Sequence, residues 1–139
     1  MFGIPQDSDL LTAFLPGGDS ATSKPLSPNG GTKRCDVIVD GDLAVRQIQT
    51  WWSGGESASN VAAAYDKMDD SRVTDDGRFL YSGTGAVGKT ATSCKSSDRP
   101  DQSLYAVVQV FAPGRSDSDA MKKLIAAYTK ALEDSNECR

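Results

Sequence analysis

The chain has 139 residues, of which 38% are hydrophobic, a formal net charge of −4 and no histidine. This length suits a single domain with an adequate core. The missing histidine removes the most common general base and every Ser–His or Cys–His nucleophile pair. The basic residues are scattered, which argues against nucleic acid as a partner. We therefore expect no cofactor and no bound metal, and we favour a protein that is not an enzyme.

The first 34 residues have the composition of an N-terminal extension, and we assign residues 35–139 to one α+β domain. Residues 7–15 predict a short capped helix that ends at the Pro-Gly-Gly of residues 16–18. Residues 19–32 are rich in Ser, Thr, Pro and Gly, and this composition predicts a loop.

The domain opens with a predicted hairpin. Residues 35–39 form a strand, Asp40-Gly41 is a strong two-residue hairpin signal, and the return strand extends to residue 52. The apolar spacing slips between Val45 and Ile48, which predicts a bulge. A capping box at residues 53–56 then opens a helix whose apolar positions continue to residue 68. Gly54 and Gly55 weaken the first turn, so a start a few residues later is the alternative.

Three strands and a helix are predicted in the second half. Residues 78–82 and 86–93 form two strands, and the apolar residues 104–111 suit a central strand that is covered on both faces. Residues 116–132 combine an N-terminal cap with an apolar stripe at helical period. We predict an α+β fold in which an antiparallel sheet of about five strands carries two helices.

The three cysteines are too far apart in sequence for a Cys-x-x-Cys site. We favour a disulfide between Cys94 and Cys138, which would tie down the last helix and contribute about 4 kcal/mol by restricting the unfolded chain. Cys35–Cys138 is the rival pairing, and the remaining Cys35 is expected to be buried. A disulfide indicates an oxidising compartment, whereas three reduced thiols would indicate the cytosol.

Residues 83–90 (GTGAVGKT) match the Walker A pattern, so they are candidates for binding phosphate. The segment that follows has no helical pattern, although a P-loop must open a helix. We therefore favour a glycine-rich turn between two strands and keep nucleotide binding as the alternative function. The candidate phosphate-binding residues of this alternative are Gly83, Gly85, Gly88, Lys89 and Thr90.

The adjacent Trp51 and Trp52 are weak candidates for a ligand-binding surface. Paired indole rings stack on sugars or apolar peptides, but tryptophans of such a pair also serve in the core. We favour core packing over binding.

The segments LTAFLPG (residues 11–17) and CDVIVDG (residues 35–41), with Trp52, Cys94 and a last helix that ends in Cys138, resemble actinobacterial cell-surface lipoprotein domains. The resemblance implies export and a lipid anchor on an N-terminal cysteine, which this chain lacks. It implies no functional residues, because many such domains have no assigned activity.

These observations together predict a non-enzymatic extracytoplasmic domain of the cell envelope, secreted or lipid-anchored. The expected partner is a protein or a cell-wall ligand, with membrane tethering through the lipid anchor. The chain starts without a basic or apolar leader, which indicates either a cytosolic protein or the mature part of an exported one, and the cysteines favour the second.

Overall fold

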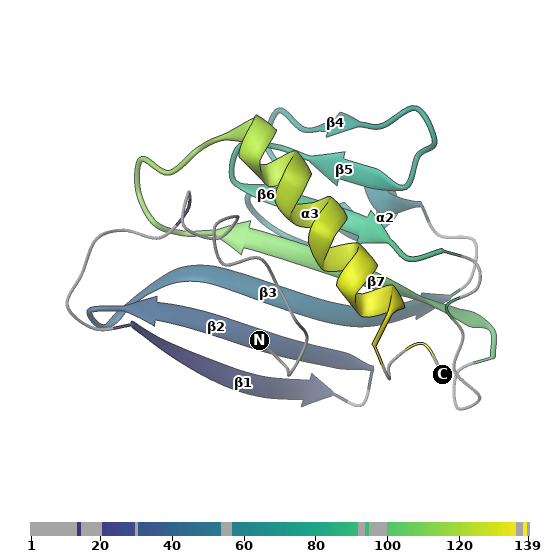
Figure 1. Ribbon diagram of the computed structural model, residues 1–139, viewed down its shortest axis with the longest axis horizontal. Helices are drawn as coiled ribbons and strands as arrows, with labels where there is room; N and C mark the ends of the chain where they lie inside the picture. The colour runs from purple at the N-terminus through teal and green to yellow at the C-terminus, as the bar shows by residue number, and fades with distance from the viewer. Residues whose placement is uncertain are drawn as a thin grey trace.

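The computed structural model describes residues 14, 21–29, 31–53, 57–91, 94, 100–135 and 138. They form one antiparallel sheet of seven strands in the order β1-β2-β3-β7-β6-β5-β4, with two helices (Figure 1). This confirms the α+β class, with seven strands rather than about five. The strands are β1 (Ala21–Asn29), β2 (Thr32–Val39), β3 (Asp42–Ser53), β4 (Arg72–Val73), β5 (Phe79–Tyr81), β6 (Gly85–Lys89) and β7 (Gln102–Val110).

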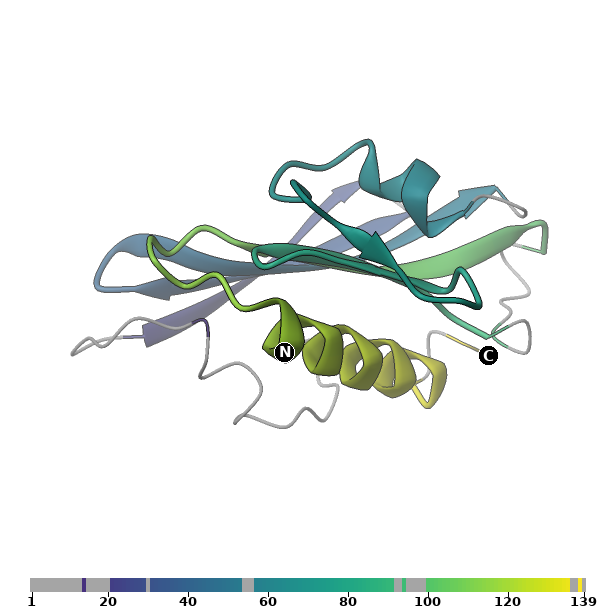
Figure 2. The same ribbon diagram turned by 90° about the horizontal axis from the view of Figure 1, so that it is seen from above.

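The two helices lie on opposite faces of the sheet, as Figure 2 shows. Helix α3 (Ser118–Glu133) packs on β5, β6 and β7, and the much shorter α2 (Ala58–Ala62) packs on β5 and β6 from the other side. We name these sides the α3 face and the α2 face. Each face has its own cluster of buried apolar side chains.

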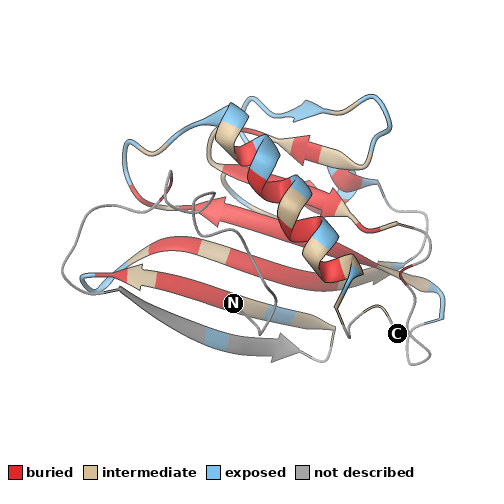
Figure 3. Ribbon diagram, in the orientation of Figure 1, coloured by how far each residue is buried: buried red, intermediate tan, exposed pale blue. Residues whose placement is uncertain are grey.

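The central strand β7 supplies both clusters, because successive side chains of a strand point to opposite faces. Leu104 and Ala106 belong to the α3-face cluster, whereas Tyr105 and Val107 belong to the α2-face cluster. Every residue from Leu104 to Val110 is buried (Figure 3). The prediction of a central strand covered on both faces is confirmed.

The predicted hairpin is formed by β2 and β3. Asp40 and Gly41 have φ angles of 50° and 87°, the left-handed pair that a tight two-residue turn requires. The register shifts between Val37 and Ile38, which leaves Ala44 as the extra residue on β3. The bulge therefore lies beside the turn rather than between Val45 and Ile48.

Two expectations for the N-terminal half were wrong. Residues 21–29 form β1, antiparallel to β2, where a loop was expected. Helix α2 starts after its cap Ser57, whose side chain accepts a hydrogen bond from the amide of Asn60, and β3 still includes Ser53. The strand thus continues through the predicted cap position, and α2 ends at Ala62 instead of near residue 68. The helix predicted over residues 7–15 lies outside the described residues except for Phe14, which is fully buried.

The last helix and the disulfide follow the prediction. The carboxylate of Asp117 caps α3 by accepting from the amide of Ala120, 3.0 Å away. Cys94 and Cys138 form the disulfide, and Cys35 is a free, buried thiol. Strand β6 ends at Lys89, so the bridge ties the end of α3 to the segment after the strand. Neither described helix has the length and apolar character to span a membrane.

Candidate functional site

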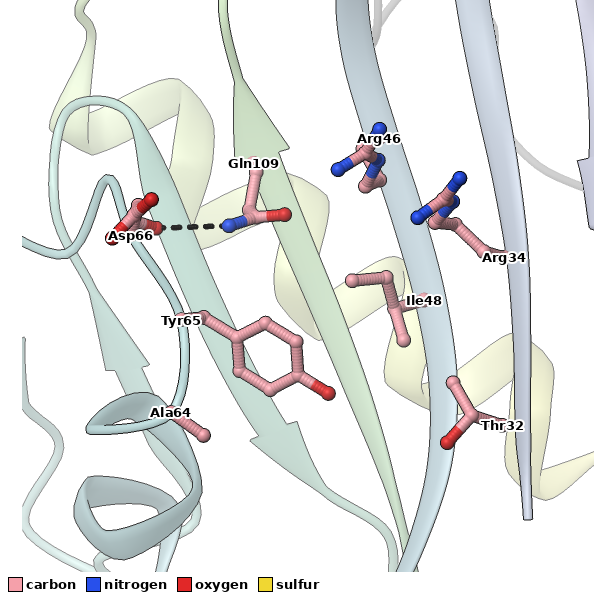
Figure 4. Close-up of a pocket in the computed structure, with 8 residues that line it drawn as sticks. All are labelled: Thr32, Arg34, Arg46, Ile48, Ala64, Tyr65, Asp66 and Gln109. Atoms are coloured by element: carbon pink, nitrogen blue, oxygen red, sulfur yellow. Dashed lines mark hydrogen bonds between the residues drawn. The ribbon is translucent and has the colours of Figure 1, made fainter. Parts of the chain in front are cut away.

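A pocket of about 240 Å³ opens on the α2 face, between strands β2 and β3 and the chain that follows α2 (Figure 4). Helix α2 packs on β5 and β6, and among the described residues no helix packs on β2 and β3 on this face. We call this cavity the α2-face pocket. It is lined by Thr32, Arg34, Arg46, Ile48, Ala64, Tyr65, Asp66 and Gln109.

Two arginines stand side by side on the sheet wall of the pocket, held by one carboxylate. The Nε of Arg46 donates to Oδ1 of Asp36 at 2.8 Å, and its Nη2 donates to Oδ2 at 3.3 Å. Asp36 lies directly across from Arg46 in the β2–β3 register, which explains this two-point contact. The Nε of Arg34 lies 3.5 Å from the same Oδ1.

Asp36 does not engage all the N–H donors of Arg34 and Arg46. The Nε of Arg34 is buried and has no hydrogen-bond partner among the described residues, because 3.5 Å is an ion-pair distance and not a hydrogen bond. A guanidinium carries five N–H donors, and Arg46 spends two of its nitrogens on Asp36. The guanidinium of Arg46 also lies over the ring of Phe111, with its carbon 5.4 Å from the centroid.

The opposite wall is formed by Ala64, Tyr65 and Asp66, which belong to the segment of residues 63–70, and three side chains fix this segment to the sheet. The amide of Gln109 donates to the carbonyl of Asp66 at 3.1 Å (Figure 4). The hydroxyls of Ser82 and Thr84 both donate to the carbonyl of Lys67 at 2.9 Å. These bonds hold Lys67 at a φ of 76°, a left-handed conformation that is unfavourable for a lysine. We call residues 63–70 the cover segment.

The phosphate-binding candidates lie in a strand and its turn, and three close contacts explain their glycines. A Cβ on Gly85 would lie 2.5 Å from the carbonyl oxygen of Lys67, so this glycine lets the cover segment approach the sheet. A Cβ on Gly88 would collide with Oγ1 of Thr129 on α3, and one on Gly83 would collide with Oγ of Ser116.

Lys89 and Thr90, the last two residues of the motif, also make contacts within the sheet. Lys89 ends β6, and its Nζ lies 5.9 Å from the centroid of the Tyr105 ring. The hydroxyl of Thr90 is buried and donates to the carbonyl of Leu104 at 2.8 Å. A P-loop needs free backbone amides at the start of a helix. Here β6 is paired on both sides, with β5 and β7, which does not favour the nucleotide alternative.

The two tryptophans do not share a surface. Trp51 packs against the α3-face cluster and Trp52 against the α2-face cluster, and both are partly buried. As neighbours in β3 they point to opposite sides of the sheet. Their rings therefore cannot form a joint stacking platform for one sugar.

The hydroxyl groups of the pocket are neutral and largely engaged. Burial raises the pKa of the Tyr65 phenol, and a hydrogen bond with Thr50 acts in the opposite direction. The hydroxyls of Thr32 and Thr50 share a hydrogen bond of 3.0 Å. None of these groups is poised as a proton acceptor near neutral pH. Within the described ranges, no group of three or more His, Cys, Asp or Glu side chains is placed to hold a metal ion.

Sequence reasoning missed the residues of this pocket. The alternation of Arg34 with Asp36 in the strand before the turn, and Arg46 in the return strand, was the available signal. A correct register would have placed Arg46 opposite Asp36. Comparisons with protein families, with curated proteins and with solved structures find nothing that matches this chain.

Proposed function

We propose that this protein is a non-enzymatic domain that works outside the cytoplasm and binds a ligand or partner group in the α2-face pocket. The observation that carries the proposal is the open pocket itself, in which Arg34 and Arg46 keep unused donors above an incompletely covered sheet. Residues that bind ligands are usually placed this way, on a rigid scaffold at the edge of a cavity.

The chemistry of the lining supports binding rather than catalysis. A guanidinium group offers N–H donors and no hydrogen-bond acceptor. The phenol of Tyr65 has a raised pKa, and Thr32 bonds to a second hydroxyl. The pocket thus offers donors and a shaped wall, but no activated nucleophile next to a base.

The disulfide supports the extracytoplasmic part of the proposal. Cys94–Cys138 bridges two positions that are 44 residues apart, and such structural disulfides persist in oxidising compartments. The resemblance to cell-surface lipoprotein domains points the same way and adds a lipid anchor upstream of this chain. Protease treatment of intact cells that produce the full-length gene product tests this location. Cleavage of the domain while a cytosolic marker survives supports it, and protection of both contradicts it.

A fragment screen by NMR tests the binding function. We expect saturable shifts of backbone amides in the cover segment and in β2 and β3 around the pocket. Ala64→Trp places an indole in the pocket and should abolish these shifts, since Ala64 is an exposed lining residue. Ala63→Trp is the matched control, because Ala63 is exposed, adjacent and outside this pocket. Fragments that bind both variants equally would show that the pocket is not the site.

A further inference from the structure

We infer that the α2-face pocket is selective for a carboxylate group of a small molecule, which the guanidinium groups of Arg34 and Arg46 receive together. This inference rests on the proposed function, because it names the ligand class for the same pocket. Three properties of the arginine pair lead to it: its charge, its unused donors and the way Asp36 holds it.

The charge of the arginine cluster matches a monoanion. Arg34 and Arg46 carry two positive charges, and Asp36, which is buried, neutralises one of them. These three side chains therefore keep one net positive charge on the pocket wall. The ammonium group of Lys67, 5.3 Å from the centroid of the Phe111 ring, adds a positive charge outside the pocket lining. A carboxylate balances the net charge on the pocket wall, whereas a phosphate dianion would leave an excess negative charge beside Asp36.

Asp66, on the opposite wall, does not cancel this preference. Its residue is exposed, so water and salt screen its charge. The arginine side chains are only 29% and 24% exposed, and their attraction for a ligand is screened less. The backbone carbonyl of Asp66 is already occupied by Gln109. The anionic end of a ligand is therefore directed to the sheet wall.

The donors are arranged for a planar, two-oxygen group. Asp36 accepts from the Nε and Nη2 of Arg46, which fixes the guanidinium plane and leaves the Nη1 group available. Arg34 makes no hydrogen bond with Asp36, and its described interaction is the ion pair at 3.5 Å. The Nη1 group of Arg46 and the terminal nitrogens of Arg34 thus present N–H donors that suit the two oxygens of a carboxylate.

Asp36 acts as a positioning residue in this arrangement. It is not among the lining residues of the pocket, and it holds Arg46 and attracts Arg34 on the same face of the sheet. The ring of Phe111 supports the other side of the Arg46 guanidinium. A preorganised arginine pair loses less side-chain entropy on binding than two mobile ones.

An NMR titration of the whole chain at constant ionic strength tests the inference. The probes are acetate, succinate, inorganic phosphate and glucose, added separately. We expect acetate and succinate to shift the Nε–Hε signals of Arg34 and Arg46 saturably, and phosphate and glucose to shift them less. Arg34→Gln should weaken the acetate response by about tenfold or more, because a charged hydrogen-bond donor is lost. Arg34→Lys keeps the positive charge but lacks the paired N–H donors of a guanidinium. Its acetate response should lie between those of the parent and of Arg34→Gln.

Arg72→Gln is the matched control, since Arg72 is exposed on β4 and lies outside this pocket. It removes the same charge and should leave the acetate response unchanged. Tighter binding of phosphate than of acetate would overturn the carboxylate assignment. An equal loss of the acetate response in Arg34→Gln and Arg72→Gln would overturn it as well. Glucose binding that Ala64→Trp abolishes would also overturn it while leaving the proposed function intact. If no probe and no screened fragment binds at the pocket, both fail.

Discussion

The two faces of the sheet are covered very differently, and under the proposed function this difference separates stability from binding. On the α3 face a 16-residue helix packs on three strands and buries an apolar stripe against them. On the α2 face a five-residue helix packs on β5 and β6, and the arginine pair lies on β2 and β3, where the cover segment forms the other wall of the pocket. The α3 face is built as a core, and the α2 face keeps room for a ligand.

The glycines of the Walker-like segment serve both faces at once. Gly88 admits Thr129 of α3 on one side, and Gly85 admits the backbone of Lys67 on the other. Strand β6 therefore packs closely against α3 on one face and against the cover segment on the other. Small residues are needed wherever two layers approach the same strand this closely.

The largest expected effect concerns the disulfide beside the α3 face. Loss of the Cys94–Cys138 bridge should lower the free energy of unfolding by about 4 kcal/mol, because the unfolded chain gains the freedom of a 44-residue separation. Urea unfolding with and without reductant measures this. The variant Cys35→Ala should respond to reductant as the parent does, since Cys35 is a free thiol. A chain with unchanged stability after full reduction would contradict the account.

A cavity in the α3-face core comes next. Leu124→Ala should cost about 3 kcal/mol, because a side chain that is 1% exposed leaves a hole that the sheet cannot close. The same unfolding assay applies. The control is Ala126→Gly: Ala126 is exposed on the same helix, and this change should cost only about 1 kcal/mol through helix propensity. Equal losses would mean that α3 is not packed as described.

A crowding variant tests the contact between β6 and α3. Gly88→Ala should destabilise by about 2 kcal/mol, because the new methyl group meets Oγ1 of Thr129. In the double variant with Thr129→Ala most of this loss should be recovered, since the colliding hydroxyl is gone. Additive effects in this double-mutant cycle would show that the two residues do not touch.

The corresponding variant on the α2 face should act on binding as well as on stability. Gly85→Ala pushes its methyl group toward the backbone carbonyl of Lys67 and displaces the cover segment. We expect a loss of about 2 kcal/mol in stability, because two hydroxyl groups hold this carbonyl in place. The acetate response of the pocket should weaken markedly in the NMR titration. In Gly88→Ala, measured below its unfolding temperature, the response should persist.

The smallest effect is a pH dependence from the α2 face. Burial raises the pKa of Tyr65 above its value in the unfolded chain. The neutral phenol therefore contributes stability that is fully present below the unfolded pKa of about 10 and is lost as pH rises through the higher folded pKa. Urea unfolding between pH 8 and pH 11 should show a smaller decline for Tyr65→Phe than for the parent. An identical decline would contradict this role of Tyr65.

Much of the fold could be predicted because local signals and tertiary structure agree. The hairpin turn at Asp40-Gly41, the apolar run in β7 and the capped, amphipathic α3 each have a strong local pattern. The Cys94–Cys138 pairing followed from the position of a cysteine just after a helix. In these elements the tertiary contacts only reinforce what the chain already prefers.

The misses occurred where tertiary pairing overrides composition. β1 contains Pro25 and Pro28, which suggested a loop, yet an edge strand tolerates proline on its unpaired side. The apolar positions after residue 62 predicted a longer helix, but Ser82 of the β5–β6 turn and Gln109 of β7 hold this segment as an irregular cover. The arginine pair was missed because it depends on the register between β2 and β3, which cannot be read directly from the sequence.

The most direct test of the account compares one variant from each face in the same acetate titration, at a temperature where both are folded. Arg34→Gln should retain nearly the parent's unfolding midpoint and lose the acetate response. Leu124→Ala should lose stability and keep the response. If both variants bind acetate alike, or if Leu124→Ala alone loses it, the assignment of binding to the α2 face and of stability to the α3 face is wrong.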